Sequence, residues 1–333
     1  MTPPLNRKIR WGVLGYARIA QQSVIPAILR SANSELHALA SRHEAKLADA
    51  RARFKMEKTY VGYEALLRDP DIDAVYIPLP NSEHRAWALQ AAEHGKHILC
   101  EKPLGLNAAE CREMIAAAGQ NGVHLMEAFM YRYTDRTAKV RDVLRSGELG
   151  EIKFINASFR FLLDRPDSIK YQPELGGGAL YDIGCYPVNF IGLVTDEIAS
   201  RPGSGSMQPE SVSAECVRRG GIDTIFSALL KYPTGLIAAA HCGFNAHRHV
   251  LAEIIGTKGT LEIPDTYFDN PGVLTLTAGE THREIVVRES DRYRAEIEDF
   301  ADAILRCRPP QFSLAETLRN AEVTDRLFAA AAK

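Results

Sequence analysis

Residues 10–20 read RWGVLGYARIA, and this short stretch decides how the rest of the chain is interpreted. The apolar run Arg10–Leu14 predicts a buried strand. Ala17–Arg30 predicts a helix that Pro26 should kink or split. Gly15 falls in the turn between them, which is where a dinucleotide pyrophosphate meets main-chain N–H groups at a helix N-terminus.

The glycine pattern of this turn is incomplete. Ala17 and Ala20 replace the later glycines of the usual G-x-G-x-x-G pattern, so an ordinary tight strand–helix turn is the alternative. The position of the turn, at the start of a strand–helix–strand unit, favours a dinucleotide site. The residues expected to line it are Gly15, Tyr16, Ala17, Arg18 and Ile19.

Strand and helix signals alternate through the first third of the chain. Further strands are predicted at Glu35–Ser41, Ala74–Leu79, His97–Cys100 and Val123–Met126. Helices are predicted at Glu44–Phe54 and Glu83–His94, and a third starts at Asn107, whose capping box includes Glu110. Repeated units of this kind predict an α/β fold with a parallel, doubly wound Rossmann sheet over residues 1–126.

The pattern changes after residue 126. Helices are predicted at 134–145 and 179–194, and strands at 152–161, 212–218, 223–231, 235–242, 248–255, 259–263, 273–277 and 283–287. Two helices, 293–305 and 314–331, close the chain. We therefore predict that residues 127–333 form a substrate-binding α+β domain with a large, mostly antiparallel open sheet. The last helix could pack back on the first domain.

Composition excludes several classes of partner. The 333 residues include 40 Lys+Arg and 42 Asp+Glu, for a net charge of −2, which provides no field for a nucleic acid or an anionic membrane. No signal peptide or membrane span is predicted, which favours a cytoplasmic protein. None of the six cysteines forms a C-x-x-C pair, so reduced, buried thiols are expected. His241, His247 and His249 lack carboxylate partners, so no metal site is predicted.

The end of the second strand selects the cofactor. NAD-binding chains carry an Asp or Glu there, whereas this chain has Ser41 and Arg42. A guanidinium and a hydroxyl suit a 2′-phosphate, so we predict NADP, with a solvated surface charge as the alternative for Arg42.

Four motifs further along the chain form a recognisable set. They are Glu101-Lys102-Pro103, Pro80-Asn81-Ser82-Glu83-His84, Gly176-Gly177-Gly178 and Asp182-Ile183-Gly184-Cys185-Tyr186. With them, the whole chain resembles the glucose–fructose oxidoreductase / inositol dehydrogenase (Gfo/Idh/MocA) family. The resemblance implies hydride transfer between NAD(P) and a polyol or sugar, and a homodimer or larger assembly through the C-terminal sheet.

Tyr186 narrows the resemblance, because many dehydrogenases of the family carry His at this position. A tyrosine at this position resembles the pattern of glucose–fructose oxidoreductases, aldose–aldose oxidoreductases and some deoxysugar ketoreductases. The run Leu125–Arg132 also resembles dimeric dihydrodiol dehydrogenases.

Oxidation of a carbinol carbon needs a base for the hydroxyl proton, and reduction needs the corresponding acid. A tyrosine has an ordinary pKa of about 10, and a nearby cation lowers it. We therefore predict Tyr186 as acid/base, assisted by Lys102. Asp182 precedes Tyr186 by four residues, so both should share one helix face and meet the sugar, or Asp182 is only a capping carboxylate.

The remaining expected site residues are assigned by position. Expected cofactor contacts also include Ser41, Arg42, Leu79, Pro80, Asn81, His84, Glu101 and Lys102, and the expected sugar contacts are Lys102, Arg160, Tyr171, Asp182 and Tyr186. His84 is either a nicotinamide-side contact or a satisfied histidine at a helix start. The expected activity is NADP-dependent oxidation or reduction of an aldose at C1. The alternatives are a ketosugar reductase, a dihydrodiol- or xylose-type dehydrogenase, and a non-catalytic NADP-binding sensor.

Overall fold

The computed structural model describes residues 7–200 and 208–332, which divide into two compact units. The first unit takes its described residues from Met1–Met130 and Asp291–Thr317, and the second from Tyr131–Ser290 and Leu318–Lys333. Residues 201–207, between the predicted helix 179–194 and the predicted strand 212–218, are not among the described residues. Among those that are described, no helix is long and apolar enough to cross a bilayer.

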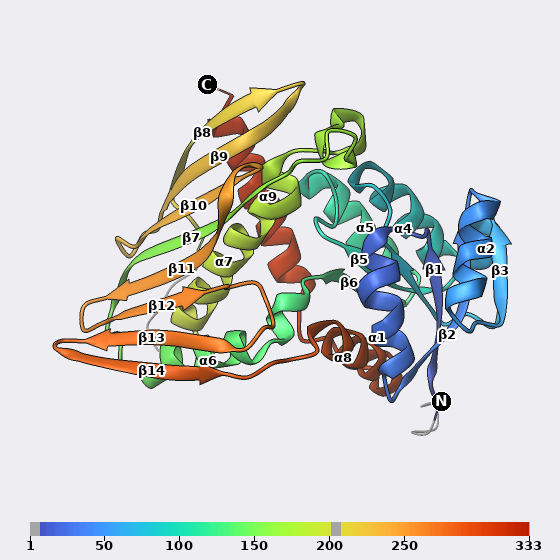
Figure 1. Ribbon diagram of the computed structural model, residues 1–333, viewed down its shortest axis with the longest axis horizontal. Coiled ribbons are helices and arrows are strands. Elements are labelled where there is room, and N and C mark those ends of the chain that lie inside the picture. Colours follow the sequence, from blue (N-terminus) through green and yellow to red (C-terminus); the bar gives the residue numbers. More distant parts are fainter. Residues whose placement is uncertain (1–6, 201–207, 333) are drawn as a thin grey trace. The chain divides into compact units, whose positions relative to one another are not determined.

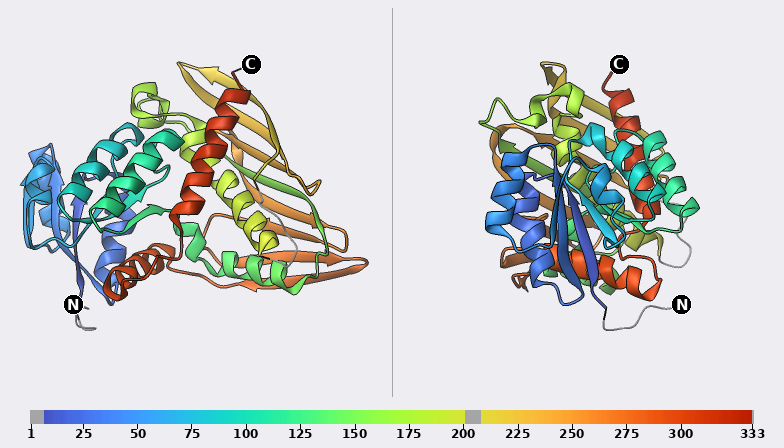
Figure 2. Two further views of the ribbon diagram at one scale, coloured as in Figure 1. Left: turned by 180° about the vertical axis from the view of Figure 1, so that it is seen from behind. Right: turned by 90° about the vertical axis from the view of Figure 1, so that its right-hand side faces the viewer.

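The first unit is a six-stranded parallel sheet in the order β3-β2-β1-β4-β5-β6. Its strands are β1 (Ile9–Leu14), β2 (Ser34–Ser41), β3 (Lys58–Val61), β4 (Ala74–Ile77), β5 (His97–Glu101) and β6 (Leu125–Ala128). Its helices are α1 (Ile25–Arg30), α2 (Glu44–Arg53), α3 (Glu64–Leu67), α4 (His84–Glu93), α5 (Ala108–Gln120) and α8 (Arg292–Arg306). The chain winds outward from β1 in both directions, so right-handed crossovers put α1 and α4 on opposite faces (Figure 2).

The predicted Rossmann sheet is confirmed, with local differences. The short β3 and α3 were not predicted, because the KTYV edge strand is half-exposed and shows no clear apolar run. The helix expected at 17–30 is split into a π-helical turn, Ala20–Val24, and α1, which has Pro26 in its first turn. The missing N–H of a proline and the clash of its ring explain why the helix is interrupted just before it.

The second unit contains an eight-stranded sheet in the order β14-β13-β12-β11-β7-β10-β9-β8 (Figure 1). Its strands are β7 (Ile152–Leu162), β8 (Ser211–Arg219), β9 (Ile222–Lys231), β10 (Ile237–Gly243), β11 (Asn245–Gly256), β12 (Thr260–Pro264), β13 (Gly272–Ala278) and β14 (Thr281–Val287). Among the described strands of this sheet, only β7 and β10 pair in parallel, so the prediction of a mostly antiparallel sheet is confirmed. The helices are α6 (Asp135–Ser146), α7 (Cys185–Ala199) and α9 (Leu314–Ala330), and α7 packs against β7 and β10.

The division between the units differs in detail from the sequence prediction of 1–126 and 127–333. The first unit continues to Met130 and also includes α8. The amphipathic face of α8 explains this, because its buried Phe300 lies 5.8 Å from the ring of Trp11 in β1. The division between the units falls within α9, after Thr317. Near the end of this helix, the ring centroid of Phe328 lies 4.8 Å from that of Tyr181, in the second unit.

Candidate active site

The carboxyl edge of the parallel sheet collects most of the residues predicted to bind the cofactor. Because all six strands point the same way, the segments after β1, β2, β4 and β5 emerge at one edge. These segments begin with Gly15, Arg42, Pro78 and Lys102. Ligands of open α/β sheets bind outside the carboxyl ends of the strands, so this edge is the candidate dinucleotide site.

The turn after β1 is shaped for a close approach to its main chain. Gly15 has a φ of 107°, and a Cβ at this position would lie 2.8 Å from Cδ2 of Leu79. The Gly15 N–H donates to Ala40 O at 2.9 Å, and the side chain of Gln21 donates to Tyr16 O at 3.0 Å. Only glycine avoids both the strain and the clash, so the turn fits a dinucleotide whose pyrophosphate approaches the main chain.

Three neighbours of this turn differ in what they can offer a ligand. The Tyr16 ring is 5% exposed, and its hydroxyl donates to Asp49 at 2.7 Å. Burial and this hydrogen bond raise the pKa of Tyr16 to about 12, so its phenol stays neutral. Arg18 is exposed and Ile19 is half-buried. Tyr16 is therefore suited to contribute main chain, and Arg18 a side chain, to a bound cofactor.

The end of β2 carries the predicted selectivity residues. The Ser41 side chain is buried, and its Oγ accepts the His43 N–H at 3.1 Å. Arg42 is not an isolated surface charge, because it donates to both carboxylate oxygens of Glu83, at 3.1 and 2.5 Å. Its guanidinium carbon lies 4.9 Å from the Tyr63 ring centroid. The sequence placed Glu83 beside predicted contacts but did not identify it as the partner of Arg42.

The loop that carries Lys102 is fixed on both sides. In β4, Tyr76 donates to Glu101 at 2.6 Å, and the Leu104 N–H donates to Glu127 at 2.9 Å. Lys102 itself is half-buried between these anchors. Neither Tyr76 nor Glu127 was predicted from the sequence, although Glu127 lies within β6 and could have been found as a charged residue in an apolar run.

His84 belongs to the same anchoring system. Its ring is fully buried, with Nδ1 at 2.9 Å from Pro103 O and Nε2 at 2.9 Å from Leu79 O. Burial lowers the pKa of His84, although both carbonyls oppose this effect. A neutral imidazole donates to one of the two carbonyls at a time. Both ring nitrogens face the main chain, which agrees with the alternative of a satisfied histidine at the helix start and not with a ligand contact.

Glu127 is a buried acid directly behind this loop. Burial raises its pKa to about 7, although Thr317, the Leu104 N–H and the charge of Lys102 all act to lower it. The carboxyl group is 3% exposed. A carboxyl that titrates near neutral pH next to the predicted activating lysine makes the local charge pH-dependent.

The predicted acid/base lies in the second unit, in the first turn of α7. Tyr186 is 4% exposed, and its ring lies 5.3 to 5.9 Å from the rings of Tyr131, Phe159 and Tyr267. Asp182 stands in a π-helical turn, Leu180–Gly184, just before Pro187 in α7. The interruption occurs where the proline ring would clash with the preceding turn, as its sequence position predicts.

Asp182 has a partner that was not predicted. Lys170 Nζ lies 2.6 Å from Asp182 Oδ2, so this acid forms an ion pair across the short helical turns that precede α7. The side chains are 29% and 16% exposed. The ion pair is a second interaction of Asp182, and contact of this carboxylate with a sugar stays a prediction.

Other polar residues of the second unit have mixed surroundings. The Tyr171 hydroxyl donates to Leu163 O at 2.9 Å, so its proton is engaged. Arg160 lies in β7, opposite Gly243 of β10 on one side and His249 of β11 on the other. Burial lowers the pKa of His241, and the positive charge of Arg160 lowers it further. Asn189 is fully buried and accepts from the Tyr131 hydroxyl and, at 3.2 Å, from Arg132. Lys102 and Tyr186 belong to different units, so their pairing stays a prediction from the sequence.

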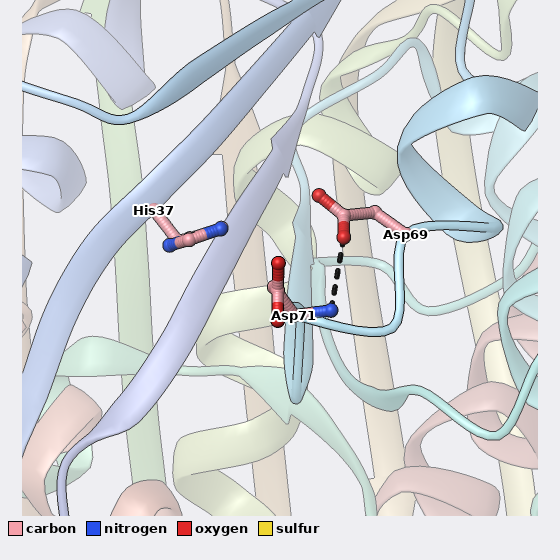
Figure 3. A group of neighbouring side chains, drawn as sticks. All are labelled: His37, Asp69 and Asp71. Atoms are coloured by element: carbon pink, nitrogen blue, oxygen red, sulfur yellow. Dashed lines mark hydrogen bonds between the residues drawn. The ribbon is translucent and has the colours of Figure 1, made fainter.

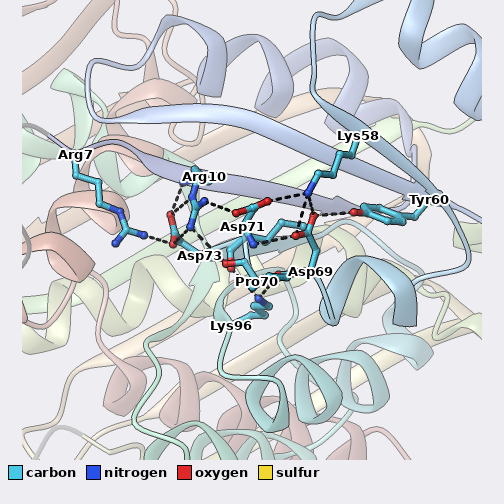
Figure 4. Close-up of polar contacts among 10 residues, drawn as sticks. Arg7, Arg10, Lys58, Tyr60, Asp69, Pro70, Asp71, Asp73 and Lys96 are labelled. Atoms are coloured by element: carbon cyan, nitrogen blue, oxygen red, sulfur yellow. Dashed lines mark hydrogen bonds and ion pairs between the residues drawn. The ribbon is translucent and has the colours of Figure 1, made fainter.

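One group among the described residues has the donor types of a metal site. Atoms of His37, Asp69 and Asp71 lie within 4.8 Å of one another (Figure 3). Lys58 already bridges the two carboxylates, at 3.0 and 2.9 Å, and Tyr60 donates to Asp69 at 2.7 Å (Figure 4). The Lys58 ammonium occupies the position between the carboxylates that a metal cation would take. We therefore do not assign a metal site to these three residues.

The fold and the site together define a two-domain oxidoreductase with a dinucleotide-binding domain. A family model described as "Oxidoreductase family, NAD-binding Rossmann fold" matches residues 9–129, and one described as "GFO/IDH/MocA C-terminal domain" matches residues 137–262. The chain belongs to the Gfo/Idh/MocA oxidoreductase family, which confirms the resemblance found from its motifs.

Similar proteins include a sugar dehydrogenase, a ketoreductase and an aldose–aldose oxidoreductase. D-xylose 1-dehydrogenase (NADP(+)) 2 of Haloferax volcanii is 34% identical over 96% of this chain and 97% of its own. The 3-ketoreductase KijD10 of Actinomadura kijaniata, solved with NADP and TDP-benzene, aligns with a TM-score of 0.89 at 30% identity over 97% of this chain and 98% of its own. Aldose–aldose oxidoreductase of Caulobacter crescentus, solved with glycerol, also aligns at 0.89, with 25% identity and 98% coverage of both chains.

Proposed function

We propose that this protein is an NADP-dependent sugar oxidoreductase that interconverts an aldose and its C1-oxidised form. The observation that carries the proposal is Tyr186 in the α7 motif, combined with Lys102 at the carboxyl edge of the Rossmann sheet, in a family whose similar members act on sugars. Bound NADP would supply the hydride acceptor or donor. The chain itself must bind the sugar, move one proton and hold the charges that make this possible.

Proton transfer would fall to Tyr186. Its buried ring is packed among three aromatic side chains, which fixes its orientation but disfavours the phenolate. A cation is therefore required to make the phenol a useful base near neutral pH, and Lys102 is the predicted source. Asp182, held by Lys170, would accept a hydrogen bond from a neighbouring sugar hydroxyl.

Replacing Tyr186 by Phe tests the enzymatic role. We expect Tyr186→Phe to lower turnover by about 100-fold or more, because it removes only the transferable proton. Its affinity for NADPH, measured by fluorescence titration, should stay within about twofold of the wild-type value. Turnover of a panel of aldoses within threefold of wild type would contradict the assignment.

The cofactor preference has its own test. Arg42 and the Ser41 hydroxyl supply donors at the end of β2, and no carboxylate stands at these two positions to bind an NAD ribose. We expect Arg42→Ala to raise the Kd for NADPH about 10- to 100-fold, as loss of a hydrogen bond to a charged group would do, and to leave the Kd for NADH unchanged. An unchanged ratio of the two constants would contradict NADP selectivity.

A ketosugar reductase or xylose-type dehydrogenase is the second candidate. The similarity to a 3-ketoreductase and to a xylose dehydrogenase favours it, and the Lys–Tyr pair suits either direction of reaction. The nicotinamide absorbance of the pure protein discriminates between the two. Bound NADPH that appears with one aldose and disappears with a second supports an aldose–aldose cycle. NADPH that appears with xylose but is not reoxidised by a second aldose supports a xylose-type dehydrogenase, and turnover only with ketosugars supports a ketosugar reductase. A non-catalytic sensor would bind NADP and turn over none of these sugars.

We also propose that the eight-stranded sheet forms a homodimer. Its face opposite α7 exposes large apolar side chains on three strands, namely Phe154, Leu162, Leu229 and Ile237. Monomeric proteins rarely expose apolar patches of this kind. Light scattering should give twice the chain mass for the wild type and the chain mass for Leu229→Glu. A wild-type monomer would contradict the proposal.

A further inference from the structure

Arg42 is held in a small cage within the first unit. Glu83 binds its two terminal nitrogens, and Tyr63 and Trp87 lie beside the guanidinium, with ring centroids at 4.9 and 6.0 Å from Cζ. Trp87 Nε1 also donates to Glu83 at 3.2 Å, so the carboxylate is fixed from a second side. The two rings meet edge to face, with their centroids 4.8 Å apart. The cage therefore holds the guanidinium in one orientation.

The cage leaves part of the guanidinium available. An arginine has five N–H donors, and Glu83 takes one from Nη1 and one from Nη2. The other three N–H groups donate to no protein acceptor among the described residues, and half of the side chain is exposed. A phosphate can therefore bind the Nε edge while Glu83 remains in place. Both anions would then share one guanidinium.

Sharing has an electrostatic consequence. A 2′-phosphate carries close to two negative charges, and Glu83 would be a third charge of the same sign on the far side of Arg42. The carboxylate both orients the guanidinium and repels the phosphate. Because Tyr63 and Trp87 also hold the guanidinium, loss of the Glu83 charge alone would not release it.

We propose that Glu83 is a specificity-determining residue that weakens the preference of this chain for NADP over NAD. It does so by sharing Arg42 with the 2′-phosphate. This inference rests on the proposed function, in which Arg42 meets that phosphate. The neighbouring Ser41 hydroxyl is uncharged, so it would be affected much less by the change.

Equilibrium titration of the full chain with NADPH and NADH tests this inference and needs no substrate. Glu83→Gln keeps the size and one acceptor oxygen, so Arg42 and Trp87 retain a partner. We expect the Kd for NADPH to fall about threefold to tenfold and the Kd for NADH to change less than twofold. The gain should shrink as KCl is raised, because salt screens exposed charges.

Two further variants separate the possible outcomes. Glu64 is exposed and also acts on Arg42 through its charge, without a hydrogen bond to it, so Glu64→Gln should change either Kd by less than about twofold. If Arg42→Ala lowers the NADPH/NADH preference but Glu83→Gln leaves it unchanged or weakens NADPH binding, this inference fails alone. If Arg42→Ala leaves the preference unchanged, the proposed cofactor selectivity fails and the role of Glu83 fails with it.

Discussion

The six parallel strands of the first unit have their amino-terminal ends on one side of the sheet (the amino edge) and their carboxyl-terminal ends on the other (the carboxyl edge). Charged residues at these two edges have different kinds of partner. At the amino edge, Arg10 binds Asp71 and Asp73, and Lys58 binds Asp69 and Asp71, so each charge meets one of opposite sign (Figure 4). At the carboxyl edge, two acids that anchor the Lys102 loop accept hydrogen bonds from neutral groups. Glu101 accepts from a tyrosine hydroxyl and Glu127 from a main-chain N–H.

This difference separates structure from chemistry. In such a network each charge is already engaged by one of opposite sign, so it has little to offer a ligand. A buried acid such as Glu127, which accepts from a main-chain N–H and has its pKa raised to about 7, carries a charge that a cofactor, a substrate or pH can change. Arg42, also at the carboxyl edge, has a charged partner in Glu83. Ionisable residues thus indicate a functional site less by their number than by the nature of their partners.

The largest effect should come from Lys102 at the carboxyl edge, with Lys58 at the amino edge as its control. We expect Lys102→Ala to lower turnover about 1,000-fold, because it removes the cation that activates the predicted acid/base. The matched variant Lys58→Ala removes an equal charge from the amino edge and should leave turnover within twofold. Steady-state rates with the best sugar of the panel measure both. Equal losses in the two variants would remove the functional distinction between the edges.

Glu127 should make stability depend on pH in the opposite sense to an acid in an ion pair. Its pKa rises from 4.5 to about 7 on folding, because the buried site favours the protonated carboxyl. The contribution of Glu127 to the free energy of unfolding is therefore largest below about pH 4.5 and is lost as pH rises through 7. At 1.36 kcal/mol per pKa unit, the loss is roughly 3 kcal/mol between pH 4.5 and 8.

Urea unfolding at several pH values measures this loss. Glu127→Gln cannot ionise, so its free energy of unfolding should be flatter over this range than that of the wild type. Glu113→Gln alters a half-exposed acid on α5 and should preserve the wild-type slope. A Glu127→Gln curve parallel to the wild type would show that Glu127 does not titrate in this range.

Much of the first unit could be predicted because its signals are local. The apolar runs and the glycine after β1 identify the sheet and the cofactor turn from adjacent residues alone. Lys102 and Tyr186 were found from short motifs. The anchors were not found, because the Tyr76–Glu101 contact joins side chains on two neighbouring strands whose rotamers the sequence does not specify. The Arg42–Glu83 pair was missed for the same reason, although both residues stand in quoted motifs.

The buried lysine of the amino edge should matter for folding and not for ligands. Lys96 Nζ donates to Asp69 O and Ile72 O at 2.6 and 2.8 Å, and the residue is 6% exposed. Lys96→Met keeps the length but leaves these carbonyls without their donor, so we expect stability to fall by about 2 kcal/mol. The Kd for NADPH should not change. A weaker Kd with unchanged stability would reverse the roles of the two edges.

The smallest effect should come from Asp71, the exposed member of the metal-like group. Its side chain is half-exposed, so its ion pairs with Lys58 and Arg10 should contribute less than about 1 kcal/mol, and Asp71→Asn should shift the unfolding free energy by no more than this. Addition of Mg²⁺ or Mn²⁺, or of a chelator, should leave the melting temperature of the wild type unchanged, because the Lys58 ammonium already bridges the two carboxylates.

Asp69 provides the contrast for this last prediction, because it belongs to the same group but is buried. Burial alone would raise its pKa, but hydrogen bonds from Tyr60, the Asp71 N–H and Lys58 outweigh burial and lower the pKa to about 2. Its contribution is therefore present above pH 4 and is lost as pH falls toward 2. Asp69→Asn should flatten the acid limb of the stability curve, whereas Asp71→Asn should alter it much less. If Mn²⁺ instead stabilises the wild type and neither Asp69→Asn nor Asp71→Asn, the three residues form a cation site and the amino edge is not a closed network.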